Sequence, residues 1–226
     1  MKNNNIIPTV FSHDKKEFLK RFNRLIKVSE KIQIDFMDGK FVPAKSITMK
    51  EIPSLKKYKV EFEAHLMVKN PKRWIKEAKQ KGFKRVIFHL EAVKTSEIGN
   101  LISLSKKLNL EVYLAINPNT KLKILLKILN KIKIKPKGIL FLGVHPGKEG
   151  QKFQKIILRR IKKLKNKYPK IITQIDGGVN ENTIKKIVKY PVDFINSGSF
   201  VSNSKSPKSQ IAFLENFFQK KLIKKV

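Results

Sequence analysis

Polar side chains that could transfer protons or bind metal ions stand where apolar, β-branched segments of the sequence end. Asp35 ends the segment 31–36, His65 ends the segment 59–66, and Asp176 directly follows the segment 171–175. A carboxylate inside an apolar strand costs free energy unless a donor or a cation pairs with it. Carboxylates and imidazoles are the side chains that most often act as general acids and bases. Comparable positions after other apolar segments hold His89, Glu91, Asn117, His145, Gly198 and Ser199.

The apolar segments that must position these residues alternate with Lys-rich segments of helical period. Strands are predicted at 5–11, 31–36, 59–66, 84–90, 110–116, 137–144, 171–175 and 192–196. Helices are predicted at 14–29, 71–81, 95–108, 120–132, 152–167, 180–189 and 207–223, with a short piece at 48–57 that Pro53 limits. Such alternation favours a parallel sheet, and eight units in 226 residues match an α/β fold of the (β/α)8 TIM barrel type. We therefore expect a single domain over residues 1–226, with a doubly wound open sheet as the alternative.

In a barrel the carboxyl ends of the strands meet at one face, where catalytic groups gather. Three glycine-bearing loops follow the last three predicted strands, HPGKEGQ at 145–151, DGGV at 176–179 and NSGS at 196–199. Glycine lets backbone N–H groups approach an oxyanion closely, and barrels often bind phosphate at the last two of these loops. The three loops together favour a phosphorylated ligand.

The composition excludes several classes of protein. The chain has no cysteine, so disulfides and thiolate metal sites are ruled out, and no apolar run reaches the ~18 residues of a membrane span. The N-terminus has no signal-peptide pattern, so a cytoplasmic location is expected. The net charge of +34 could indicate an RNA partner, but only 6 of the 51 basic residues are Arg, and the lysines are spread over nearly every helix. We favour a solvated Lys-rich surface that attracts small anions.

The chain resembles the ribulose-phosphate 3-epimerases from about residue 7 to residue 201. The resemblance rests on eight segments in the same order and spacing: PTVFSHD, IQIDFMDGKFVP, EAHLMV, FHLEA, LAINPNT, LGVHPGKEGQKF, IDGGVNENTI and NSGSFV. These enzymes are (β/α)8 barrels that interconvert ribulose 5-phosphate and xylulose 5-phosphate. The combination of MDGKFVP, HLMV and PG..GQKF in one chain is specific.

The resemblance implies roles for individual residues. Asp35 and Asp176 correspond to the proton-transfer pair, and both, together with His65, correspond to ligands of one divalent metal ion, whether Zn, Fe(II), Mn or Co. Met37 and Met67 would cover the site. The implied substrate-binding residues are Thr9, His65, Gly147, Lys148, Gly150, Gly177, Gly178, Gly198 and Ser199.

The sequence departs from the family pattern at the metal site and in the phosphate loop. Gln33 stands where the family has a fourth ligand, a His, and an amide oxygen is a weaker donor for zinc-like metals. We expect Gln33 to be either a weak ligand or a group that supports the ligands through hydrogen bonds. Glu149 puts a negative charge beside Lys148 in the phosphate loop, and His145 replaces a residue that is usually Asn. The sequence offers no account of His145.

The leading expectation is a metal-assisted 3-epimerase of a small phosphorylated ketose. Two alternatives stay open: an epimerase of a related ketose phosphate such as allulose 6-phosphate, and a phosphosugar-binding barrel that has lost metal and activity. No membrane or nucleic-acid partner is expected, and the sequence leaves open whether the chain forms a homo-oligomer.

Overall fold

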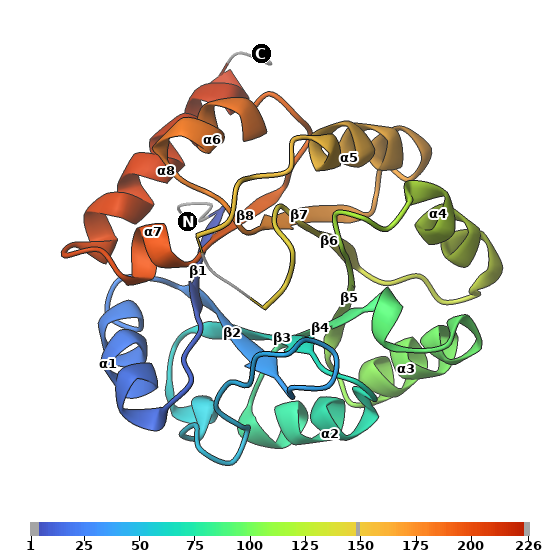
Figure 1. The fold of residues 1–226 in the computed structure, drawn as a ribbon, viewed down its shortest axis with the longest axis horizontal. Coiled ribbons are helices and arrows are strands. Elements are labelled where there is room, and N and C mark those ends of the chain that lie inside the picture. The colour runs from blue at the N-terminus through green and yellow to red at the C-terminus, as the bar shows by residue number, and fades with distance from the viewer. Residues whose placement is uncertain (1–4, 148–149, 224–226) are drawn as a thin grey trace.

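A computed structural model describes residues 5–147 and 150–223 of the chain. Eight parallel strands close into a barrel in sequence order, each paired with its neighbours and β8 with β1 (Figure 1). The strands are β1 Ile6–Val10, β2 Lys31–Met37, β3 Glu61–Met67, β4 Arg85–His89, β5 Glu111–Ile116, β6 Gly138–Leu142, β7 Ile172–Asp176 and β8 Phe194–Ser197. The predicted (β/α)8 barrel is confirmed, and the open sheet is wrong.

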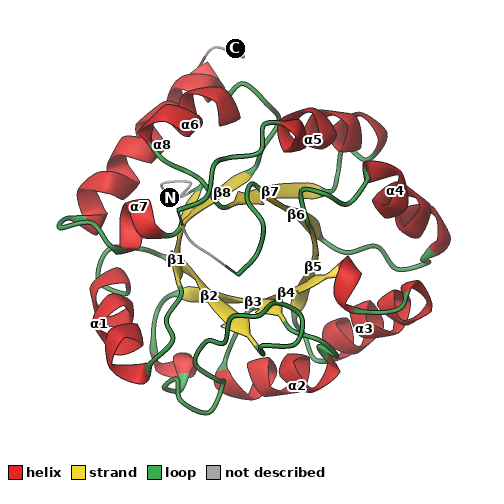
Figure 2. Ribbon diagram, viewed as in Figure 1, coloured by secondary structure: helices red, strands yellow, loops and turns green. Residues whose placement is uncertain are grey.

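Helices surround the barrel on its outside (Figure 2). They are α1 Lys15–Leu25, α2 Lys72–Lys81, α3 Thr95–Lys107, α4 Leu122–Lys131, α5 Ile156–Lys167, α6 Glu181–Ile187, α7 Ser199–Ser202 and α8 Pro207–Ile223. The connection from β2 to β3 contains only the 3₁₀ turn Leu55–Lys57, as the short piece predicted there suggests. A second 3₁₀ turn, Leu90–Ala92, directly follows β4. None of the described helices combines the length and the apolar character that crossing a membrane requires.

Strand β2 explains how one segment can be both apolar and polar. Successive side chains of a strand point to opposite faces, so Ile32, Ile34 and Phe36 belong to the core between barrel and helices, and all three are fully buried. Burying each such side chain stabilises the fold by about 1.5–3 kcal/mol. The alternate residues Gln33 and Asp35 therefore face the inside of the barrel.

The inside of the barrel has an apolar part and a polar part. A separate buried cluster is formed by Ile87, Tyr113, Ala115, Leu140 and Leu142, which come from β4, β5 and β6. The strands β2, β3, β7 and β8 instead contribute buried polar residues: Gln33, Asp35, Glu63, His65, Gln174, Asp176 and Asn196. The polar part leads up to the carboxyl ends of these strands.

Candidate active site

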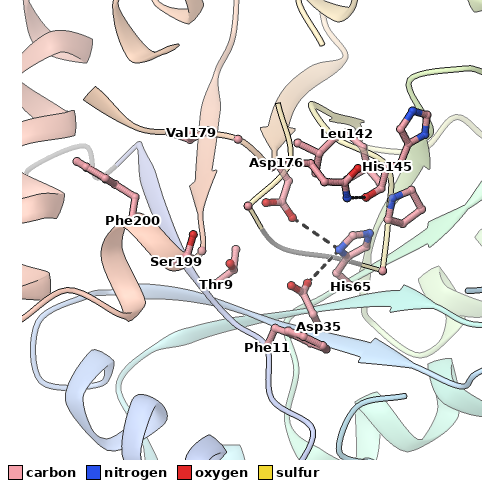
Figure 3. Close-up of a pocket in the computed structure, with 18 of the residues that line it drawn as sticks. Thr9, Phe11, Asp35, His65, Leu142, His145, Asp176, Val179, Ser199 and Phe200 are labelled. Atoms are coloured by element: carbon pink, nitrogen blue, oxygen red, sulfur yellow. Dashed lines mark hydrogen bonds and ion pairs between the residues drawn. The ribbon is translucent and has the colours of Figure 1, made fainter. Parts of the chain in front are cut away.

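A cavity of about 470 Å³ opens at the carboxyl ends of the strands (Figure 3). The loops after β6, β7 and β8 form one side of it, and β1, β2 and β3 form the other. Twelve residues predicted for the site line this cavity: Thr9, Asp35, Met37, His65, Met67, Gly147, Gly150, Asp176, Gly177, Gly178, Gly198 and Ser199. Lys148, also predicted, lies outside the described residues, as does Glu149.

Asp35, His65 and Asp176 converge at the inner end of the cavity. The register of β2 and β3 pairs Asp35 with His65, and Asp176 ends β7. His65 Nδ1 lies 3.0 Å from Asp35 Oδ1 and 3.7 Å from Asp176 Oδ2, as the dashed lines in Figure 3 mark. One ligand atom from each of the three residues lies within 4.8 Å of the others. Two carboxylates and one imidazole in this arrangement can hold a divalent cation.

Burial and mutual charge alter the acidity of these groups. Burial, aided by the negative charge of Asp35, raises the pKa of Asp176 to about 7. Burial opposes protonation of His65, but the hydrogen bond and charge of Asp35 outweigh it, so the pKa of His65 is raised. Without a cation, the site therefore retains protons near neutral pH. This is the expected response of like charges that share a buried site.

Gln33 lies directly beneath the two carboxylates and is fully buried. Its side-chain nitrogen donates to Asp35 Oδ1 at 2.9 Å and to Asp176 Oδ2 at 2.6 Å. Its oxygen accepts from Asn196 Nδ2 at 2.8 Å. The amide thus turns its donor toward the carboxylates and its oxygen away from them. In this geometry Gln33 holds both carboxylates by hydrogen bonds, and its role at a metal site stays a prediction.

A further layer of buried polar residues, which the sequence reasoning missed, lies next to Gln33. Asn196 Nδ2 also donates to Glu63 Oε1 at 2.8 Å, and Asn196 Oδ1 accepts from Gln174 at 2.7 Å. Arg85 Nη1 donates to Glu63 Oε2 at 2.5 Å. A signal for two of these residues was present in the sequence. Glu63 and Gln174 precede His65 and Asp176 by two positions, just as Gln33 precedes Asp35, so each strand carries two inward polar residues.

The glycine loops supply the cavity wall opposite β2 and β3. Gly147, Gly150, Gly177 and Gly178 all have positive φ, which side chains rarely adopt. At Gly178 a Cβ would also meet Phe153 Cβ at 3.1 Å. These positions therefore favour glycine for the backbone conformation. Gly177, where a Cβ would meet Val144 Cγ2 at 2.5 Å, and Gly178 also favour it for lack of space.

Apolar side chains cover another part of the cavity. Met37 and Met67 form a buried cluster with Val42, and Phe11 and Phe41 pack against it. Such a cover limits the access of water to Asp35 and His65. Thr9, which is 4% exposed, lies in the adjacent β1 wall.

The remaining strand-end residues divide into two groups. His145 is exposed, lines the cavity and accepts a hydrogen bond on its backbone oxygen from Gln151. His89, Glu91 and Asn117 do not line the cavity but lie behind His65. Burial lowers the pKa of His89.

Comparison with known proteins connects this geometry with one family. Residues 5–202 match the sequence model of the ribulose-phosphate 3-epimerase family. A ribulose-phosphate 3-epimerase of Schizosaccharomyces pombe is 28% identical over 95% of this chain and 94% of its own. The enzyme named as the cytoplasmic isoform in Oryza sativa is 27% identical over 92% of each chain.

Solved structures with the same architecture are more distant in sequence. A 3-hexulose-6-phosphate synthase from Salmonella typhimurium superposes with a TM-score of 0.73 at 12% identity, covering 96% of this chain and 99% of that one. An orotidine 5'-phosphate decarboxylase from Pyrococcus horikoshii gives a TM-score of 0.68 at 15% identity, with coverage of 95% and 99%. At these identities the likeness concerns the fold alone.

Proposed function

This chain belongs to the ribulose-phosphate 3-epimerase family, and from that premise we propose that it interconverts D-ribulose 5-phosphate and D-xylulose 5-phosphate. The reaction removes the proton on carbon 3 from one face of the sugar and returns a proton to the other face. It needs two acid–base groups and stabilisation of the enediolate between the two steps. The observation that carries the proposal is the convergence of Asp35, His65 and Asp176 in the cavity.

Asp35 and Asp176 are proposed as the acid–base pair. They come from β2 and β7 and both reach the cavity, so a sugar bound there can present its two faces to different carboxyl groups. In the metal-free site burial raises the pKa of Asp176 to about 7, so this carboxyl can carry a proton near neutral pH. An acid and a base at one centre need different environments.

The same three residues fit a divalent cation. Asp35, His65 and Asp176 would hold it, because their ligand atoms already lie within 4.8 Å of one another. When bound, such a cation supplies Lewis acidity that stabilises negative charge on the oxygens of the enediolate. Zn, Fe(II), Mn and Co all accept this set of ligands. Gln33 would hold the two carboxylates in place by its two donated hydrogen bonds.

The phosphate of the substrate is proposed to bind on the glycine side of the cavity. That side is lined by the backbone of four glycines, in conformations that residues with side chains rarely adopt: Gly147, Gly150, Gly177 and Gly178. Gly198 and Ser199 adjoin them. Exposed backbone N–H groups in such loops bind oxyanions. Thr9 and the cover formed by Met37 and Met67 would enclose the sugar.

The test is an epimerase assay on ribulose 5-phosphate with metal-stripped and metal-restored protein, using Zn, Mn, Fe(II) and Co in turn. Asp35→Asn and Asp176→Asn should each reduce turnover at least ~100-fold, the lower end of general acid–base contributions. Near-normal turnover in either variant contradicts the assignment of that residue. Turnover of allulose 6-phosphate in preference to ribulose 5-phosphate would change the proposed substrate but keep the mechanism.

The rice relative is named as a cytoplasmic isoform, and we propose the same location for this chain. The inactive-barrel alternative was motivated by Gln33. The retained convergence of Asp35, His65 and Asp176 argues against it. A homo-oligomeric state is left open, and the absence of a nucleic-acid partner stays a prediction.

A further inference from the structure

The two ring nitrogens of His65 have different surroundings. Nδ1 faces Asp35 and Asp176, whereas Nε2 lies 3.0 Å from Nε2 of His89. Two nitrogens at this distance form a hydrogen bond only if one carries a proton and the other offers a lone pair. The imidazole of His65 can thus present its lone pair to Asp35 and Asp176, or to His89, depending on which nitrogen is protonated.

The far side of His89 decides between these arrangements. His89 Nδ1 lies 3.4 Å from Glu91 Oε2. His89 Nδ1, Glu91 Oε2 and Asn117 Oδ1 are all buried, and none of the three has another hydrogen-bond partner in the described part of the chain. The other oxygen of Glu91 accepts from the backbone N–H of Asn117 at 2.8 Å and from Thr120 Oγ1 at 2.5 Å. A lone pair of His89 directed at these oxygens would leave buried acceptors facing one another.

The ring plane of His89 is also held in place. Phe41 packs on it with centroids 4.8 Å apart, and the ring of His65 stacks near it with centroids 5.2 Å apart at an angle of 25°. His89 is fully buried, so water does not provide an alternative partner. Because Nδ1 of this buried ring faces a carboxylate oxygen and Nε2 faces a second imidazole nitrogen, a proton on Nδ1 and a lone pair on Nε2 satisfy both sides.

We propose that Glu91 and His89 form a relay that fixes the tautomer and the orientation of His65. Glu91 accepts the Nδ1 proton of His89, His89 Nε2 accepts the Nε2 proton of His65, and Nδ1 of His65 is left to bind a divalent cation. Glu91 and His89 are positioning residues that act through His65. Metal-binding histidines usually donate their second N–H to a carboxylate, a carbonyl or water. Here a second imidazole connects the ligand to the carboxylate.

The relay rests on the proposed metal site, and Glu91→Gln tests it with little change in shape. The amide oxygen of the substituted side chain must stay on the Asn117 N–H and Thr120, so its NH2 group turns toward His89 and donates. His89 then accepts this hydrogen bond on Nδ1 and carries its own proton on Nε2. That proton faces the Nε2 proton of His65, so the two rings can no longer form their hydrogen bond. Glu97→Gln is the matched control, because Glu97 is exposed and likewise accepts a backbone N–H, from Lys94.

Calorimetric titration with Co(II) should show about 10- to 100-fold weaker binding for Glu91→Gln, the usual effect of losing a partner of a metal-binding His. Glu97→Gln should bind as wild type does. His89→Gln should bind Co(II) with most of the wild-type affinity, since the new amide can accept a hydrogen bond from His65 and donate one to Glu91. Nitrogen-15 NMR of the metal-free proteins should find the His89 proton on Nδ1 in wild type and on Nε2 in Glu91→Gln.

Equal Co(II) affinity in Glu91→Gln and wild type overturns the relay and leaves the proposed function intact. A wild-type His89 protonated on Nε2 overturns it as well, and this measurement decides the matter if Glu91→Gln does not fold. Wild type that binds no Co(II) contradicts the proposed metal site and the relay together. An epimerase assay on the same samples separates this outcome from loss of the relay alone.

Discussion

Replacing Asp176 by Asn should make the metal-free protein more stable at neutral pH while it abolishes catalysis. Asp176 is buried beside Asp35, and burial together with this neighbouring charge raises its pKa from 3.8 to about 7. Asn has nearly the same shape, cannot ionise, and can still accept the hydrogen bond that Gln33 donates to Asp176 Oδ2. The substitution therefore removes the cost of a buried charge and keeps the packing.

The size and sign of this stability difference follow from proton linkage. Below pH 4 the carboxyl is protonated in both the folded and the unfolded chain, so it adds no pH dependence. Between pH 4 and pH 7 the unfolded chain releases its proton first, so ionisation favours unfolding and stability falls as pH rises. The difference of about 3 in pKa corresponds to a loss of about 4 kcal/mol that is complete above pH 7. The Asn variant escapes this loss, so its stability relative to wild type should grow by about 2–4 kcal/mol from pH 4 to pH 8.

Urea unfolding of chelator-treated wild type and Asp176→Asn at pH 4, 6 and 8 measures the effect, because the midpoint and slope together give the free energy of unfolding. Asp14→Asn is the control: Asp14 is exposed and caps α1 by accepting from Glu17 N, and Asn caps equally well. Its stability difference from wild type should stay nearly constant with pH. A difference for Asp176→Asn that stays flat or shrinks between pH 4 and pH 8 refutes the reasoning.

Two further substitutions test the phosphate wall and the fourth ligand position. Gly178→Ala should raise the KM for phosphorylated substrate at least ~10-fold, because Gly178 has a φ of +70° and a Cβ there would meet Phe153 at 3.1 Å. Gly99→Ala is the control: a Cβ at Gly99 would meet only Ile132, at 3.9 Å, so KM should stay unchanged. Gln33→His should bind a divalent cation more tightly than wild type in a calorimetric titration, by about 10-fold, because imidazole is the better ligand. Gln33→Leu, which can neither donate nor coordinate, should bind more weakly than both, and a Gln33→His variant no tighter than Gln33→Leu would contradict the ligand argument.

The convergence of Asp35, His65 and Asp176 was predictable because it follows from topology. Parallel strands that close into a barrel bring their carboxyl ends to one face, so residues that end separate strands meet there whatever their distance in sequence. The alternation of β2 fixes which residues turn inward, and it assigns Gln33 and Asp35 to the interior together. The positions of the glycine loops follow from the same rule.

The orientation of Gln33 could not be predicted in this way. It depends on Asn196, which lies 163 residues away on β8, and a valine or an alanine at that position would fit the strand pattern as well. The contact between His65 and His89 likewise depends on side-chain geometry across β3 and β4, which the spacing of the sequence does not specify. Both features belong to the barrel interior, where packing and hydrogen bonding select one arrangement among several that share the same alternation.

Gln33 bears on how two carboxylates can share one buried site. An amide donor placed between Asp35 and Asp176 supplies each of them with a hydrogen bond whether or not a cation is present, and hydrogen bonds to charged groups contribute about 1.5–3 kcal/mol. An imidazole at the same position would give a bound cation another ligand, but without the cation it could donate to both carboxylates only when protonated at both nitrogens. Compared with an imidazole that acts as a fourth ligand, Gln33 thus favours the metal-free state of the site. On the proposed assignment Gln33 takes the place of a fourth ligand, and its hydrogen bonds hold the two carboxylates without a cation.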